Sequence, residues 1–382
     1  MKPLDKRLLE LNVQEAAEFD FQNNKVFGSA YYVFQRNQVV YQKCFGHTSA
    51  DGSEPVTENT LFRLASMTKP ITAFALLLLV DKSFVSLDDP IYKYLPEFAE
   101  WHFVPTINGE LIDKGITNIH PTIKNLLTHT SGLGSSPLKG GCITPADKKT
   151  IDSYVAFYLK MGLEYEPGTR QEYSGMAAYD ILAKIVEEVS GVDYWHFLKR
   201  EIFEPCDMQD TVFVPSEEQW KRLVSMHTNI GGENVVDTTY NNRVFEDFPC
   251  THYLGGAGLV STLNDYVKFA KMLLNNGRVG TKQLLSQELV ELMRKPHVSS
   301  EIMPGPERWG LGVRVVVDES YKDLPVGAYG WSGAYGTHFW VDPENEIIAV
   351  YMKNSRIDGG SGNESGKNFE KAVRNSLQRV NY

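Results

Sequence analysis

Strand-forming segments occur near both ends of this chain of 382 residues, and a long stretch of helical spacing separates them. From about residue 61 to residue 270, apolar residues recur with the period of helices, interrupted by polar loops. The strand-like runs cover residues 26–35, 38–45, 310–318, 336–342 and 346–353. Asn37 marks a hairpin turn between the first two runs. A sheet that begins at one end of a chain and is completed at the other requires the middle to be an insertion.

The fold class predicted from this order is α+β. Residues 1–60 and 300–382 are expected to form one α/β domain, and residues 61–299 a mainly helical region. The α/β domain should include a helix over residues 8–19 and a closing helix over residues 367–380, each with an apolar side. We expect a cleft between the two regions, because such junctions are favoured positions for substrate pockets.

The charge balance and the termini limit the partners and the location. The chain carries 48 acidic and 38 basic side chains, a formal net charge of −10, and no basic cluster that would reverse the sign locally. Neither nucleic acid nor a membrane is therefore expected as a partner. Residues 1–19 lack the apolar core of a secretory signal, and the longest apolar run, residues 71–80, is too short to span a bilayer. We expect a cytoplasmic protein and leave its oligomeric state open.

The first pattern with chemical content is Ser66 followed three residues later by Lys69, at the start of a helical apolar run. At this spacing the hydroxyl and the amine share one face of a helix. A neutral amine can accept the proton of a neighbouring hydroxyl, and the amino end of a helix favours the negative charge that develops on attack. The S-x-x-K pattern also arises by chance, so a plain helix cap at Ser66 is the alternative. A second match at residues 136–139 lies in a Gly- and Pro-rich loop and is interpreted as coincidence.

Several uncommon strings follow one another in a fixed order. They are Phe62–Pro70 (FRLASMTKP), Leu126–Leu133 (LLTHTSGL), Pro167–Thr169 leading to Tyr173, and Gly255–Leu259 (GGAGL). In this order they resemble the serine β-lactamase and penicillin-binding protein superfamily, and most closely its class C β-lactamase-like esterases, the family VIII carboxylesterases. The resemblance covers about residues 62–342. It implies a serine β-lactamase-like fold, an antiparallel sheet flanked by helices with a large, mainly helical insertion.

The resemblance also implies roles for individual residues. Ser66 is the expected nucleophile, and Lys69 and Tyr173 are the pair that moves its proton. Backbone amides of Ser66 and Ala334 are the expected oxyanion hole. The expected substrate-binding residues are Trp331, Ser332, Gly333 and Gly175.

Two of these positions depart from the β-lactamase pattern. Trp331 stands where β-lactamases have the Lys of Lys-Thr-Gly, which attracts the carboxylate of the antibiotic. Gly175 stands where their Tyr-x-Asn motif has the Asn that holds an acylamino side chain. Ser332 departs slightly from the Trp-Gly-Gly string of the esterases. Losing the cation and the amide favours neutral esters over β-lactams and peptides.

The predicted function is hydrolysis of a small-molecule ester through an acyl-enzyme on Ser66. The alternatives are a β-lactamase or D-amino-acid peptidase or amidase using the same residues, a transacylase, and a non-catalytic binding module on the same scaffold. The intact Ser66, Lys69 and Tyr173 argue against the binding module. His129 is expected to brace a loop by hydrogen bonding. The nine histidines lack metal-binding spacing and no nucleotide motif is present, so neither a metal nor a cofactor is expected.

Overall fold

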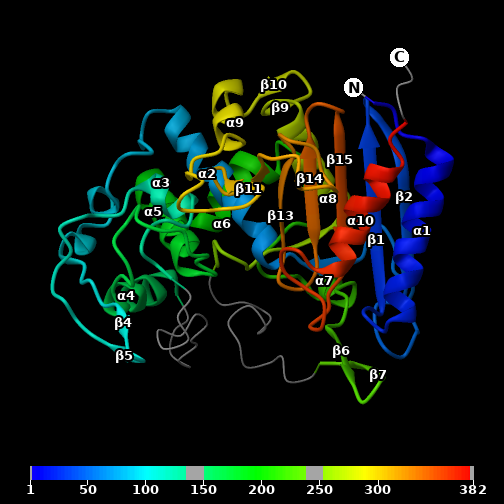
Figure 1. Ribbon diagram of the computed structural model, residues 1–382, viewed down its shortest axis with the longest axis horizontal. Coiled ribbons are helices and arrows are strands. Elements are labelled where there is room, and N and C mark those ends of the chain that lie inside the picture. The colour runs from blue at the N-terminus through cyan, green and yellow to red at the C-terminus, as the bar shows by residue number, and fades with distance from the viewer. Residues whose placement is uncertain (1, 135–149, 238–252, 379–382) are drawn as a thin grey trace.

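A seven-stranded antiparallel sheet forms the centre of the computed structural model, which describes residues 2–134, 150–237 and 253–378 (Figure 1). The strand order is β11-β12-β13-β14-β15-β1-β2. The strands are β1 (Gly28–Gln35), β2 (Gln38–Gly46), β11 (Glu307–Trp309), β12 (Arg314–Val316), β13 (Tyr329–Ser332), β14 (His338–Asp342) and β15 (Ile347–Met352). Because β1 pairs with β15 along its length, the two ends of the chain meet in the middle of the sheet, as predicted. The division into two domains at residues 60 and 300 stays a prediction.

Residue chemistry explains the hairpin at the start of the sheet. Arg36 and Asn37, between β1 and β2, both have positive φ, at 51° and 60°. Two left-handed residues are what a tight two-residue hairpin of this type requires, and Asn tolerates that conformation better than most residues. The expected turn at Asn37 is therefore confirmed.

Alternation along the strands separates two layers of core. On one face lie α1 (Lys6–Gln22) and α10 (Glu364–Asn375). Their apolar residues pack against Tyr31, Trp340 and Tyr351 of the sheet. On the other face, α8 (Leu263–Leu274) and α2 (Thr68–Asp81) pack against residues such as Tyr32, Phe339 and Val350. α2 is covered on nearly all sides, and accordingly its apolar residues are not confined to one stripe.

The remaining elements surround α2 or connect the layers. The other helices are α3 (Ile123–Leu127), α4 (Ile151–Met161), α5 (Ala177–Ser190), α6 (Tyr194–Leu198), α7 (Glu217–Lys221) and α9 (Gln287–Met293), with short turns η1 (Ala65–Met67), η2 (Ile91–Lys93), η3 (Pro96–Glu100) and η5 (Lys199–Phe203). Two-stranded pairs are β3 (Leu61–Arg63) with β8 (Val260–Thr262), β4 (Thr106–Ile107) with β5 (Glu110–Leu111), β6 (His227–Ile230) with β7 (Glu233–Val236), and β9 (Arg278–Val279) with β10 (Lys282–Gln283). No helix in the described ranges is both long and apolar enough to cross a membrane.

Several predicted boundaries differ from the structure. The strand expected over residues 310–318 is only β12, Arg314–Val316. Residues 310–313 instead form the tight turn between β11 and β12, in which Gly312 has φ 77° and the Gly310 N–H bonds to the Val313 carbonyl. The closing helix begins at Glu364, earlier than expected, because the Asn363 side chain caps it by accepting from the Gly366 N–H.

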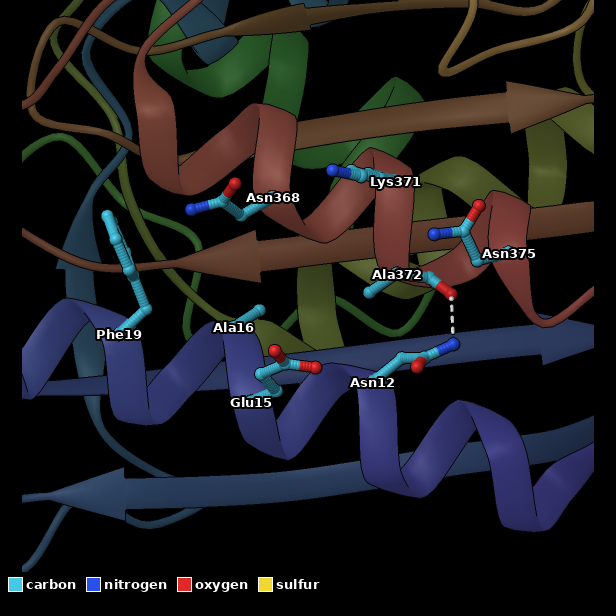
Figure 2. A pocket seen from close by; sticks show the side chains of 8 residues that line it. All are labelled: Asn12, Glu15, Ala16, Phe19, Asn368, Lys371, Ala372 and Asn375. Carbon is cyan, nitrogen blue, oxygen red and sulfur yellow. Dashed lines mark hydrogen bonds between the residues drawn. The ribbon is translucent and has the colours of Figure 1, made fainter.

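A pocket of about 360 Å³ opens between α1 and α10 and is lined mainly by polar side chains of both helices (Figure 2). Asn12 reaches across it and donates to the Ala372 carbonyl at 3.4 Å. This pocket lies on the α1–α10 side of the sheet. Leu64 and Met67, which flank Ser66, belong to the core on the opposite side.

Candidate active site

Ser66 lies in η1, a short turn that links β3 to α2. The turn is fixed from the central sheet: Asn354 accepts from the Arg63 N–H at 2.9 Å and donates to the Arg63 carbonyl at 3.0 Å. Thr337 donates to the Leu64 carbonyl at 3.0 Å. Ala65 is held in the left-handed region, with φ 46°, which costs a non-glycine residue about 1 kcal/mol. Such strained residues persist only where their surroundings fix them, and they gather at functional sites.

The Ser66 hydroxyl is directed at two other predicted residues. Tyr173 donates to Ser66 Oγ at 2.8 Å, and Lys69 Nζ lies 3.3 Å from the same oxygen. Ser66 is half-buried, so a substrate can reach it. The first residue before α2 is Met67, and no side chain caps that helix. The alternative that Ser66 is a plain helix cap is therefore wrong.

Lys69 is completely buried, and its amine is held by backbone carbonyls. Its Nζ donates to Gly175 O at 2.6 Å and to Gly256 O at 2.7 Å. The rings of Tyr173 and Tyr179 lie 5.1 and 5.3 Å from Nζ. Gly175 therefore contacts Lys69 through its carbonyl. A Cβ built at Gly175 would meet no atom within 4 Å, so the glycine leaves open space beside the amine.

Two tryptophan rings pack against the ring of Tyr173. Trp309 stacks on its ring at 6.0 Å with an interplanar angle of 13°, and Trp331 lies at 5.4 Å. With its amide oxygen facing them, Gln171 accepts from Trp309 Nε1 at 3.1 Å and from the Tyr173 N–H at 3.3 Å. Trp331 is 7% exposed, and its ring lies 4.5 Å from that of Trp309. These contacts fix the position of the phenol.

His129 contacts the rings of Tyr173 and Trp309 and is fully buried. Burial, with a contribution from the nearby Lys69, holds its pKa well below the usual value. Its Nδ1 therefore accepts, taking the Ser174 N–H at 3.1 Å. Its ring also contacts Tyr173 at 4.6 Å. These contacts are those of a residue that braces the Tyr173 loop, as the sequence predicts.

The remaining predicted residues are Ser332, at the end of β13, and the two that follow it, Gly333 and Ala334; the chain approaches the Ser66 turn at Gly333. A Cβ at Gly333 would lie 2.3 Å from Leu64 O, so only glycine lets this segment approach the Ser66 turn. Gly333 N–H bonds to Thr337 O, whereas no acceptor in the described part of the chain takes the Ala334 N–H. By contrast, the Ser332 hydroxyl lies on the α10 face of the sheet, 2.8 Å from His338 Nδ1, and not on the face of Ser66.

Three residues beside the site are not predicted individually from the sequence: Gly256, Trp309 and Asp180. The GGAGL string gives a signal for Gly256, but not for its role as a carbonyl acceptor. Trp309 and Asp180 carry no sequence signal, because both act through contacts with residues far away along the chain. Within residues 2–134, 150–237 and 253–378, no group of three His, Cys, Asp or Glu side chains is arranged to hold a metal ion.

A serine hydroxyl held beside a buried lysine and a tyrosine, in a fold of an antiparallel sheet with a helical insertion, is an arrangement found in serine hydrolases. Comparison with known families places the chain within that class. The model of the Beta-lactamase family matches residues 12–368. The chain belongs to the Beta-lactamase family and is a serine hydrolase.

Individual relatives cover most of the chain. Protein Rv1367c of Mycobacterium tuberculosis is 31% identical over 360 residues, which are 85% of each chain. Esterase EstB of Burkholderia gladioli is 26% identical over 387 residues, with 94% of each chain covered. The solved structure of EstCE1, described as a hydrolase with promiscuous acyltransferase activity, superposes with a TM-score of 0.82 at 22% identity, over 97% of this chain and 99% of its own. This superposition confirms the predicted fold.

Proposed function

We propose that the protein hydrolyses neutral carboxylic esters through an acyl-enzyme on Ser66. The observation that carries the proposal is the half-buried Ser66 hydroxyl, which lies within 3.3 Å of both Lys69 Nζ and the Tyr173 hydroxyl. A nucleophile, a proton acceptor and a group that orients them are thereby within hydrogen-bond reach of one another.

The first step is attack of Ser66 Oγ on the ester carbonyl carbon. As the new C–O bond forms, the Ser66 proton passes to the Lys69–Tyr173 pair. A neutral amine has two hydrogens and one lone pair; with the hydrogens held by Gly175 O and Gly256 O, the lone pair faces Ser66. The negative charge on the carbonyl oxygen would be stabilised by the N–H groups of Ser66 and Ala334. Each such donor is commonly worth about 2.7–4 kcal/mol in the transition state.

The second half of the cycle releases both products. Tyr173 returns the proton to the leaving alkoxide as the ester C–O bond breaks, which leaves the acyl group on Ser66. Water then attacks the acyl-enzyme, its proton is taken by the same pair, and the carboxylic acid leaves as Ser66 is regenerated.

The surroundings of Trp331 favour a neutral substrate. The cation closest to its ring among the described contacts is Arg314, 6.0 Å away. Arg314 is already paired, with Glu307 at 2.5 Å and Glu370 at 3.6 Å, so it is not available to a substrate carboxylate. Esterase EstB, a relative along 94% of its length, is named for ester cleavage. A cytoplasmic location stays a prediction.

Parallel rate measurements test the proposal. Short-chain p-nitrophenyl esters and a chromogenic cephalosporin are assayed side by side, with Ser66→Ala as control. Fast, Ser66-dependent ester turnover with little lactam cleavage is expected. Preferential lactam turnover would favour a β-lactamase or peptidase, and a product formed with an added alcohol in place of the free acid would favour a transacylase.

Covalent labelling separates the nucleophile from the substrate. A fluorophosphonate should label the protein, Ser66→Ala should abolish the label, and Lys69→Ala should nearly abolish it while the fold stays intact. Labelling that survives Ser66→Ala would disprove the assignment of the nucleophile.

A further inference from the structure

Lys69 is a buried amine without an ion-pair partner in contact with it. It is completely buried, and no carboxylate of the described residues lies within ion-pair distance of its Nζ. In the proposed reaction this amine takes a proton and becomes a cation. An uncompensated charge in a buried position is costly, so a countercharge close behind the contact groups would lower the barrier.

Asp180 of α5 is a buried carboxyl that interacts electrostatically with Lys69. It is 1% exposed, and its Oδ1 accepts from the Gly256 N–H at 3.3 Å. The carbonyl of the same Gly256 accepts from Lys69 Nζ at 2.7 Å. One peptide residue therefore connects the carboxyl to the amine: its N–H bonds to Asp180 and its C=O bonds to Lys69.

The segment that makes this connection is closely packed. A Cβ at Gly255 would lie 2.2 Å from Tyr179 O, so the chain there approaches α5 as only glycine allows. The Gly255 carbonyl accepts from Thr72 Oγ1 of α2 at 2.6 Å. Asp180 and Thr72 together fix the position of the Gly255–Gly256 peptide, and hence of the carbonyl that holds Lys69.

The groups that face Asp180 come from several helices. Tyr158 of α4 donates to Asp180 Oδ2 at 2.8 Å. The charge of Lys69 of α2 lowers the pKa of Asp180, and the charge of Asp180 in turn contributes to the raised pKa of Tyr194 of α6. Burial raises the pKa of Asp180 to about 7, against the lowering effects of Tyr158, Gly256 and Lys69. The charge of Asp180 thus changes in the range where an esterase works.

We propose that Asp180 is a positioning residue that acts through Lys69. Its carboxylate stabilises the ammonium form that Lys69 adopts after taking the Ser66 proton, and its bond to Gly256 fixes the carbonyl that orients the amine. The inference deepens the proposed function, on which its catalytic consequence rests.

The test is the pH dependence of Ser66 labelling in Asp180→Asn. Asn has nearly the same shape as Asp. Its oxygen can accept from the Gly256 N–H, and its NH2 group can donate to the Tyr158 hydroxyl, which then acts as the acceptor. The substitution therefore removes mainly the charge. Without the anion, the positive charge that forms on Lys69 during the reaction is less stabilised. The fluorophosphonate labelling rate of Asp180→Asn should therefore fall about tenfold above pH 7, where Asp180 is charged in the unsubstituted protein, and by less toward pH 5, where that carboxyl is neutral.

Asp265→Asn is the matched control. Asp265 is also a buried carboxyl, 4% exposed, but its charged neighbour is Lys268. Asp265→Asn should leave the labelling rate unchanged at every pH. If Asp180→Asn only lowers the rate by one factor at every pH, or has no effect, the proposal is overturned. Should Asp180→Asn fail to fold, Tyr158→Phe, which removes one bond that stabilises the carboxylate, should give a smaller loss of labelling rate, largest near pH 7.

A second measurement distinguishes this proposal from the proposed function. If labelling does not depend on Ser66, the proposed function fails, and the Asp180–Lys69 interaction is judged from urea unfolding at pH 8. Asp180→Asn should lower the unfolding midpoint in the protein with Lys69. In Lys69→Met, where the carboxylate has lost its countercharge, it should raise the midpoint or lower it less. Equal shifts in both backgrounds would overturn the interaction.

Discussion

The residues that meet at Ser66 differ in how visible they are in the sequence. Lys69 is three positions away and shares a motif with Ser66, so it is predicted directly. Tyr173 is 107 positions away and is found only because the surrounding string resembles a family. Gly256 is 187 positions from Lys69, and the sequence gives no sign that its backbone carbonyl accepts a hydrogen bond from the amine. Side chains with distinctive chemistry can be predicted from sequence, whereas backbone acceptors cannot.

Ser332 shows that a side chain can also be mispredicted from a motif. Its motif position predicts contact with the substrate, but its hydroxyl points away from the site and bonds to His338. It is 2% exposed and bonds to His338, whose Nε2 meets Glu370 of α10 at 2.9 Å. Ser332→Ala should leave His338 Nδ1 without a partner and lower the free energy of unfolding by about 1–3 kcal/mol. We expect kcat/KM for esters to change by less than about twofold.

Chemical denaturation and steady-state kinetics of the same preparation check this prediction. Trp331→Phe is the comparison, since its ring faces Tyr173, and it should change KM. A large rise in KM for Ser332→Ala at unchanged stability would mean that Ser332 contacts the substrate after all.

At the scale of elements, the approach of the sheet to the Ser66 turn depends on Asn354, just beyond β15. This residue is 3% exposed and makes both bonds to the Arg63 backbone. Asn354→Ala would leave the partly buried N–H and carbonyl of Arg63 without these partners, which should lower the free energy of unfolding by about 1–2 kcal/mol. Because Arg63 precedes the strained Ala65, Ser66 labelling should slow by about tenfold, as expected when a nucleophile loses its orientation.

Two variants make the Asn354 experiment specific. Asn354→Asp keeps the acceptor for the Arg63 N–H but loses the donor, so its stability and its labelling rate should lie between those of Asn354→Ala and the unsubstituted protein. Asn345→Ala removes a comparably buried amide, 4% exposed, from the turn between β14 and β15. It should reduce stability without slowing the labelling. Equal labelling by Asn354→Ala and the unsubstituted protein would contradict a role in positioning.

The elements themselves are predicted to different degrees. The paired strands β1 and β2 follow from their apolar runs, and β14 and β15 likewise. By contrast, β13 has only four residues, two of them Gly330 and Ser332, so no periodicity reveals it, and only the family motif indicates a strand there. The end of α10 at Asn375 could not be predicted from the sequence either. Apolar residues continue at helical spacing beyond it, whereas the chain leaves the helix and pairs Leu377 with Leu4. Tertiary contacts decide such boundaries.

At the scale of the whole molecule, one continuous core joins the sheet to the helical region. It includes Tyr32 and Phe339 of the sheet, Phe74 of α2, and Tyr266 of α8, whose ring meets that of Phe339 at 5.0 Å. The order of the chain predicts that the two ends share a sheet, but it cannot predict which face the insertion covers. Because this core is shared, a buried group beside Ser66 should influence the stability of the entire molecule.

Buried histidines make that stability depend on pH. Burial lowers the pKa values of the fully buried His129 and His227, and partial burial that of His297, from the usual 6.5; Lys69 contributes to the effect at His129. The unfolded chain takes up protons at these residues below about pH 6.5, while the native state resists them. The unfolded state therefore binds more protons, and the free energy of unfolding should fall as the pH decreases from about 6.5, by up to about 1.4 kcal/mol per pH unit for each such histidine.

His129→Asn isolates one of these contributions. Asn accepts a left-handed backbone, such as the φ of 55° at this position, and its oxygen can replace Nδ1 as acceptor for the Ser174 N–H. Urea unfolding between pH 5 and 8 should show a shallower acid slope for His129→Asn, by up to about 1.4 kcal/mol per pH unit. His196→Asn, at a side chain 63% exposed, serves as control and should keep the slope of the unsubstituted protein. An unchanged slope in His129→Asn would mean that the native state binds a proton at His129 as readily as the unfolded chain does, and His129 could then take part in proton transfer at Ser66.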